Sequence, residues 1–155
     1  MSSVWLQAPQ RGTVARARVV SIVDARVIER TPYLDLLPSW SILGMIEHAA
    51  AESPAKSAIV VVAKDDVTRV GWRITYAELA AMVRATASRL CEVSGSAQPV
   101  VSILTPLVAE SFIASWAGST VGISNPINPY LRIEHVASIM NAAGTTVLVC
   151  GSAAD

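Results

Sequence analysis

From residue 41 onward, hydrophobic positions alternate between helical spacing and short β-branched runs. Residues 41–52 carry apolar side chains every three or four positions, namely Ile42, Met45, Ile46 and Ala49. This spacing predicts an amphipathic helix that ends at Ser53-Pro54. Two β-branched runs follow at residues 58–63 and 70–75, with Lys64-Asp65-Asp66 between them. The pattern therefore predicts a β-hairpin.

The next segment begins with a helix start signal. In Thr75-Tyr76-Ala77-Glu78, the Thr75 hydroxyl can accept from the Glu78 amide while the Glu78 carboxylate accepts from the Thr75 amide. The helix that follows has one apolar face and is followed by Gly95. That face consists of Leu79, Met82, Val83, Thr86, Ala87 and Leu90.

Three further strand-like runs are separated by single helices. The runs are residues 100–104, 121–124 and 146–150. Thr105-Pro106 supplies a predicted N-cap for the first intervening helix, and Gly144 is predicted to end the second, which begins near Ile133. Strands joined by single helices favour parallel pairing through right-handed crossovers. We therefore expect an α/β fold in which a β-hairpin precedes alternating helices and parallel strands, with ligands binding near strand ends.

Residues 1–40 differ from the rest in charge. Five arginines occur there, and the first acidic residue is Asp24. Such a basic start is found in organelle transit segments, whereas the alternative is a poorly ordered leader with a short helix at residues 14–29. We therefore expect a leader over 1–40 and an incomplete domain over 41–155.

Composition excludes several classes of protein. The chain has 155 residues, 52% of them hydrophobic, and its 12 basic and 12 acidic residues cancel. A zero net charge gives no overall attraction to nucleic acid or an anionic membrane, and no apolar run reaches the roughly 18 residues of a membrane span. We therefore expect a cytoplasmic protein. Cys91 and Cys150 lack metal or redox spacing and are expected to be buried structural thiols.

Recognisable catalytic and cofactor motifs are absent from the sequence. Neither Lys56 nor Lys64 follows a glycine-rich turn, and no GxGxxG or GxSxG occurs. His48 and His135 fall on different predicted helices, without a second ligand at i+4, and Asp65-Asp66 fits a solvated turn better than a cation site. We therefore predict no catalytic, cofactor-binding or metal-binding residue in this chain.

Two Asn-Pro steps stand three residues apart, at Asn125-Pro126 and Asn128-Pro129. Each proline removes an amide donor and pushes the preceding asparagine toward extended geometry, while the asparagine side chain can bond to local backbone. These properties predict a rigid, outward-turned connection between the strand at residue 121 and the helix after Leu131. A plain stiff connector is the simplest interpretation.

Several stretches together resemble the AMP-forming acyl-CoA synthetases of the adenylate-forming superfamily. Residues 72–79 (WRITYAEL) are similar to the family's T-Y-x-E-L segment, and residues 121–129 (VGISNPINP) to its G-x-x-x-P-x-N-P segment. Between them, Pro106 and Glu110 stand where the family has P-N-x-x-E, although Leu107 replaces the asparagine. The family's usual G-D before the strand at residue 100 is replaced by Ala97-Gln98-Pro99. The order and spacing of the motifs match from about residue 41 to residue 149.

The resemblance implies a partial N-terminal subdomain of the adenylate-forming fold. The intact family enzyme would form an acyl-adenylate from a carboxylic (fatty) acid and ATP, and then transfer the acyl group to CoA. ATP, Mg²⁺ and CoA are implied for that enzyme, but the family's residues for them lie downstream of this chain. At the position of a CoA-phosphate arginine found in some members, this sequence has Ser138.

Three hypotheses follow from these patterns. The chain is a synthetase fragment that is inactive alone and prone to self-association through an exposed sheet edge. Alternatively, it is a stand-alone α/β interaction module derived from the synthetase scaffold, without catalysis. A flavodoxin-like ligand binder is a third hypothesis, and Leu104-Thr105-Pro106-Leu107 is a poor phosphate loop for it.

Overall fold

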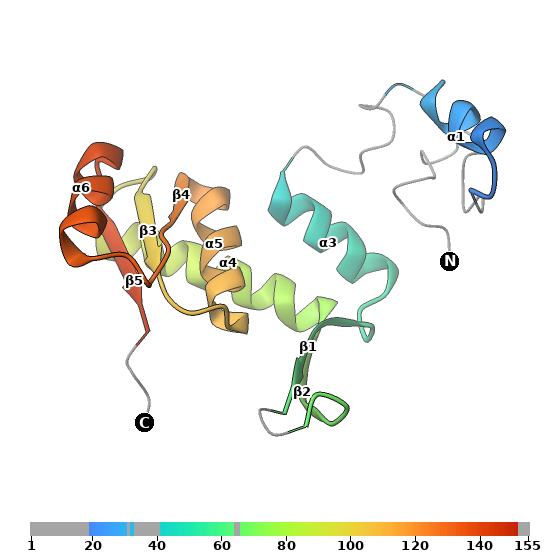
Figure 1. Cartoon of the computed structure of the whole chain (residues 1–155), viewed down its shortest axis with the longest axis horizontal. Coiled ribbons are helices and arrows are strands. Elements are labelled where there is room, and N and C mark those ends of the chain that lie inside the picture. The colour runs from blue at the N-terminus through green and yellow to red at the C-terminus, as the bar shows by residue number, and fades with distance from the viewer. Residues whose placement is uncertain (1–18, 31, 33–40, 64–65, 152–155) are drawn as a thin grey trace.

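The computed structural model describes residues 19–30, 32, 41–63 and 66–151. Within these ranges, helices and strands alternate much as the sequence predicts (Figure 1). In chain order, they are α1 (Ile22–Glu29), α3 (Ile42–Glu52), β1 (Ser57–Val62), β2 (Val70–Thr75), α4 (Tyr76–Ser94), β3 (Val100–Leu104), α5 (Ala109–Val121), β4 (Ile123–Pro126), α6 (Ile133–Ala143) and β5 (Val147–Cys150). Of the predicted helix over 14–29, residues 14–18 lie outside the described ranges.

The predicted hairpin and capping box are both present. Strands β1 and β2 pair antiparallel, and β2 leads directly into α4. The Glu78 amide donates to Thr75 Oγ1 at 3.3 Å, and the Thr75 amide donates to Glu78 Oε2 at 2.8 Å. Gly95 and Gly144 end α4 and α6 with φ of 63° and 66°, a left-handed conformation that glycine adopts without a Cβ clash.

A three-stranded parallel sheet has the order β4-β3-β5. Helix α5 connects β3 to β4, which lies on one side of β3 in the sheet. Helix α6 then connects β4 to β5, which lies on the other side of β3. Right-handed crossovers in opposite directions place their helices on opposite faces of a sheet, and Figure 1 shows α5 and α6 on opposite sides of the strands. The predicted α/β class and parallel pairing are confirmed.

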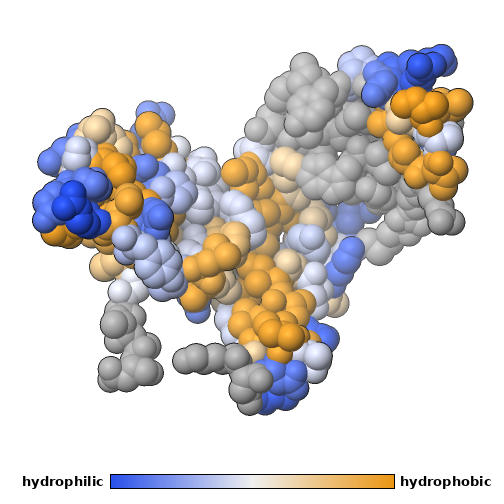
Figure 2. Space-filling view, viewed as in Figure 1, coloured by the Kyte–Doolittle hydropathy of each residue, from blue (hydrophilic) through white to orange (hydrophobic). Residues whose placement is uncertain are grey.

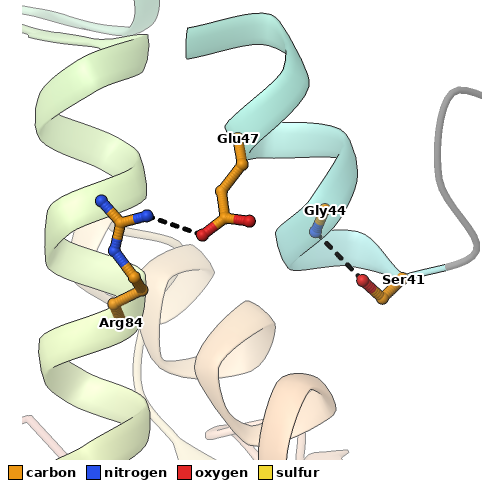
Figure 3. Close-up of polar contacts among 4 residues, drawn as sticks. All are labelled: Ser41, Gly44, Glu47 and Arg84. Carbon is orange, nitrogen blue, oxygen red and sulfur yellow. Dashed lines mark hydrogen bonds and ion pairs between the residues drawn. The ribbon is translucent and has the colours of Figure 1, made fainter. Parts of the chain in front are cut away.

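The core lies between α4, α5 and the sheet. Val83, Val101 and Ala117 are fully buried there, and Ile74 of β2 joins the hairpin to the same cluster. Helix α3 contributes Ile46 to this core. Figure 3 shows its outer contact with α4, where the Arg84 guanidinium lies 2.6 Å from the Glu47 carboxylate. Both side chains are about half exposed, so the ion pair contributes little to stability.

Helix α3 begins with a serine cap that the sequence analysis did not identify. The Gly44 amide donates to Ser41 Oγ at 3.0 Å (Figure 3). This bond satisfies one of the amides that a helix leaves unpaired in its first turn. The predicted helix over 41–52 therefore matches α3 and its cap residue.

Helix α5 begins later than predicted. Thr105 is not its N-cap, because the chain first makes a turn in which the Val108 amide donates to the Pro106 carbonyl at 2.9 Å. Val108 takes the cap position, and the Ser111 hydroxyl accepts from its amide at 3.1 Å. The strand predicted over residues 121–124 is also shifted, to 123–126, because α5 extends to Val121.

Among the residues that the structure describes, no helix is both long and apolar enough to cross a bilayer.

Candidate functional site

A groove lies where β3 and β4 end. Because these strands are parallel and Ile103 faces Pro126 in the register, both following loops leave the same edge of the sheet. The groove has a volume of about 460 Å³, within the range of small-molecule sites. It is lined by Ile103, Thr105, Pro106, Leu107, Ser111, Phe112, Ser115, Pro126, Ile127, Asn128, Pro129 and Tyr130.

The groove wall is apolar and aromatic with a few hydroxyl groups. Leu107 and Tyr130 are 85% and 90% exposed at its rim, and Phe112 lies 5.7 Å from Trp116 between ring centroids. None of its lining residues carries a charge at neutral pH. The Thr105 Oγ1 atom is buried and has no hydrogen-bond partner among the described residues. Such a wall can contact an apolar ligand or another part of a protein, but it supplies no carboxylate or imidazole for proton transfer.

The two Asn-Pro steps have different structural roles. We predicted that Asn125-Pro126 belongs to the connection. This prediction is wrong, because these residues are the last two of β4. Proline is accommodated because β4 is an edge strand, where an outward position needs no ladder amide. The following Ile127 amide resumes pairing by donating to the Ile103 carbonyl at 2.9 Å.

The second step forms the predicted rigid turn. Asn128 Oδ1 accepts from the Tyr130 amide at 3.0 Å, and the Asn128 carbonyl accepts from the Leu131 amide at 3.3 Å. The side chain of the asparagine therefore replaces a backbone partner, as expected for this residue before proline. This turn holds Pro129 and Tyr130 at the groove rim.

A small polar network fixes β4 to β3. Ser102, which is fully buried, accepts through Oγ from Asn125 Nδ2 at 3.0 Å and shares a hydrogen bond of 2.6 Å with Thr145 Oγ1. Buried hydroxyl and amide groups are costly unless paired, so these three residues favour one register of the sheet. Sequence reasoning missed this network, because its members come from three separate segments.

The histidines and aspartates discussed in the sequence analysis do not come together into one site among the described residues. His48 lies on α3 and is half-buried, while His135 is exposed on α6 with Nε2 3.3 Å from Arg132 Nη2. Asp65 and Lys64 lie outside the described residues, and Asp66 accepts from the Thr68 amide at 2.9 Å in the hairpin turn. This turn holds the pKa of Asp66 below its usual value, chiefly through the Thr68 hydroxyl.

The prediction for the cysteines is wrong for Cys150, and Cys91 is only half-buried. Cys150 is exposed because it ends β5, an edge strand of the sheet. Both thiols are free.

The groove lacks the side chains that would bind a nucleoside triphosphate or Mg²⁺. It has no lysine or arginine for phosphates and no carboxylate for the metal, and the described residues form no cluster of three His, Cys, Asp or Glu side chains. Ser138 is exposed on α6, and Glu110 is exposed in the first turn of α5. We therefore assign no step of ATP or metal chemistry to these residues.

Comparison with known proteins identifies the family. Residues 46–155 match the model of the AMP-binding enzyme family. The chain is also 27% identical over 134 residues to marinolic acid–CoA ligase from Pseudoalteromonas sp. (strain SANK 73390), an alignment that covers 84% of this chain and 20% of the ligase.

Solved structures share the fold. A Mycobacterium tuberculosis fatty acyl CoA synthetase matches with a TM-score of 0.62 and 27% identity, covering 72% of this chain and 21% of that chain. The N-terminal subdomain of Klebsiella oxytoca NpsA matches with a TM-score of 0.60 and 19% identity, covering 73% of this chain and 27% of that chain, which shows a common fold. The chain thus spans about a fifth to a quarter of the length of the relatives it matches. It belongs to the AMP-binding enzyme family and corresponds to an N-terminal part of the AMP-forming synthetases.

Proposed function

We propose that this chain is the scaffold portion of an AMP-forming acyl-CoA synthetase whose substrate is a fatty acid. In the intact enzyme, the carboxylate would attack the α-phosphate of ATP, giving acyl-adenylate and pyrophosphate. The CoA thiolate would then displace AMP to form the thioester. The observation that carries this proposal is the match over residues 46–155 to the AMP-binding family, in the same segment that holds the three ordered motifs.

The part played by residues 41–151 in this proposal is structural. They provide the parallel sheet, its helices and the uncharged groove, while ATP, Mg²⁺ and CoA are held by other parts of the intact enzyme. The same proposal includes two further statements. The synthetase domain begins near residue 40, and the 155-residue chain alone is inactive.

The test begins at the gene. Reading all three frames past the codon for Asp155 should reveal a Ser/Thr/Gly-rich loop that ends in lysine. The product of the whole reading frame should exchange labelled pyrophosphate into ATP only when a fatty acid is present, whereas the 155-residue chain should show no exchange. Exchange by the short chain, or none by a full-length product, contradicts the proposal.

A second proposal has one observation in its favour. A groove of about 600 Å³ runs along the open edge of β5 beneath α4, lined by residues such as Thr86, Arg89 and Leu148. A strand with one open edge beside a helix wall suits an added β-strand from a partner, which fits a stand-alone interaction module. If no synthetase segment follows in any reading frame, this module becomes the better proposal.

A further inference from the structure

Helix α1 exposes aliphatic and cationic side chains together. Ile22, Arg26 and Arg30 follow one another at intervals of four residues, and Val23 and Val27 form the adjacent row. Residues four apart lie on the same side of a helix, so these two rows share one face. All five side chains are exposed, and α1 has no buried residue.

One of the two acidic residues of this helix, Asp24, lies off that face. Its carboxylate accepts from the amides of Val20 and Ser21 at 3.0 and 2.9 Å. Asp24 is therefore occupied as the N-terminal capping group. Glu29, seven residues after Ile22, is exposed at the edge of that face, so the face carries two arginines and one carboxylate.

The surrounding sequence adds to the positive charge. Arg11, Arg16 and Arg18 precede α1, and no acidic residue occurs before Asp24. The zero net charge of the whole chain thus conceals a basic N-terminal region. Figure 2 shows hydrophobic and hydrophilic residues together on the surface of α1.

We propose that the exposed face of α1 binds the surface of an anionic lipid bilayer. Val23, Val27 and Ile22 would enter the boundary between headgroups and acyl chains, while Arg26 and Arg30 would pair with lipid phosphates. Interfacial helices combine these two features, and acidic lipids attract basic segments. A nucleic acid matches the charge but leaves the aliphatic residues in water, so the bilayer is the better fit. This proposal does not depend on the proposed function.

Vesicle flotation tests the proposal with the 155-residue chain, taken from a size-exclusion peak so that only vesicle-bound protein floats. The chain should float with vesicles of phosphatidylcholine and phosphatidylglycerol, remain unbound with phosphatidylcholine alone, and be released by salt. Arg26→Gln should lower the partition coefficient about five-fold, the value of one basic residue near such a surface. Val23→Ser should also lower it.

Matched controls lie on α4. Arg89 is 73% exposed in its side chain and Val93 is 59% exposed, so Arg89→Gln and Val93→Ser remove the same groups from another surface and should leave flotation unchanged. Because α1 buries no residue, none of the α1 variants should alter the urea midpoint of the chain.

Three results would overturn the proposal. Equal flotation with neutral and anionic vesicles would show attachment without charge recognition. Equal losses in the α1 and α4 variants would show general electrostatic attraction. Binding of a short RNA duplex through Arg26, with no vesicle binding, would assign the face to nucleic acid.

Discussion

Among the glycines in the described part of the chain, Gly122 has the least room for a Cβ atom. A Cβ at this position would lie 2.1 Å from the Pro99 carbonyl oxygen, and Pro99 is fully buried. The close approach exists because the Ile123 amide donates to that same carbonyl at 3.0 Å. The glycine thus lets α5 turn directly into β4 beside the start of β3.

Gly122→Ala should therefore reduce the free energy of unfolding by about 1–3 kcal/mol, the usual cost of forcing extra volume into packed structure. Urea denaturation followed by circular dichroism measures this loss. Ser119→Ala, at an exposed position of the same helix, should change stability far less. Equal stability of the two variants would contradict the role given to Gly122.

At the scale of elements, α4 depends on its N-terminal cap for part of its stability. The Thr75 backbone amide, followed by the Thr75 hydroxyl, donates to Glu78 and holds the pKa of this carboxyl below its usual 4.5. A lowered pKa in the folded state means that the carboxylate form favours folding. This contribution is present above pH 4.5 and is lost as the pH falls through the lowered folded value.

Glu78→Gln should destabilise the chain at about pH 7, and the loss should shrink as the pH falls below 4.5 and through the lowered folded pKa of Glu78. Urea unfolding over a series of pH values gives the comparison. Glu52→Gln, at the C-terminal end of α3, should not destabilise at neutral pH, because a negative charge is unfavourable at that end of a helix. A pH-independent loss in Glu78→Gln would refute the ionic part of the cap.

Local signals explain which elements the sequence predicts well. Strand β3 and the capping box of α4 have the predicted bounds because their residues carry the information themselves. The start of α5 was predicted wrongly because Val108, an unusual cap residue, is completed by Ser111. The prediction that Pro126 lies in a loop is wrong because a proline can end β4 only where this strand is at the edge of the sheet.

The groove could not be predicted as a set of residues. The rule that ligands bind near strand ends points to the edge of the sheet where the groove lies, but the lining comes from two loops and α5. Their arrangement depends on the order β4-β3-β5, which apolar spacing does not specify. Two parts of this lining, the Asn-Pro steps and Thr105-Pro106-Leu107, were singled out from the sequence without being placed together.

At the scale of the molecule, the described sheet has two open edges. Strands β4 and β5 each pair only with β3 in the described sheet, and Leu148 of β5 is 43% exposed. Open edges with apolar side chains pair readily with another chain. We therefore expect the 155-residue chain to self-associate.

The sedimentation coefficient of the chain should rise with protein concentration, and Leu148→Lys should shift the distribution toward monomer. Lysine on an edge strand opposes pairing between edges. Ile133→Lys, at a position of α6 that is 70% exposed, is the control and should leave association unchanged. A wild-type chain that stays monomeric at every concentration and unfolds cooperatively would refute this expectation.

The position of β3 between two partners has a consequence for local opening. Its backbone is covered by a neighbour on both sides, and Val101, Ser102 and Ile103 are buried, so its amide hydrogens can exchange with solvent only when the sheet separates. Hydrogen exchange follows the free energy of such openings. The amides of β3 should thus be the last in the sheet to acquire deuterium, and their rate reports the opening of the whole fold.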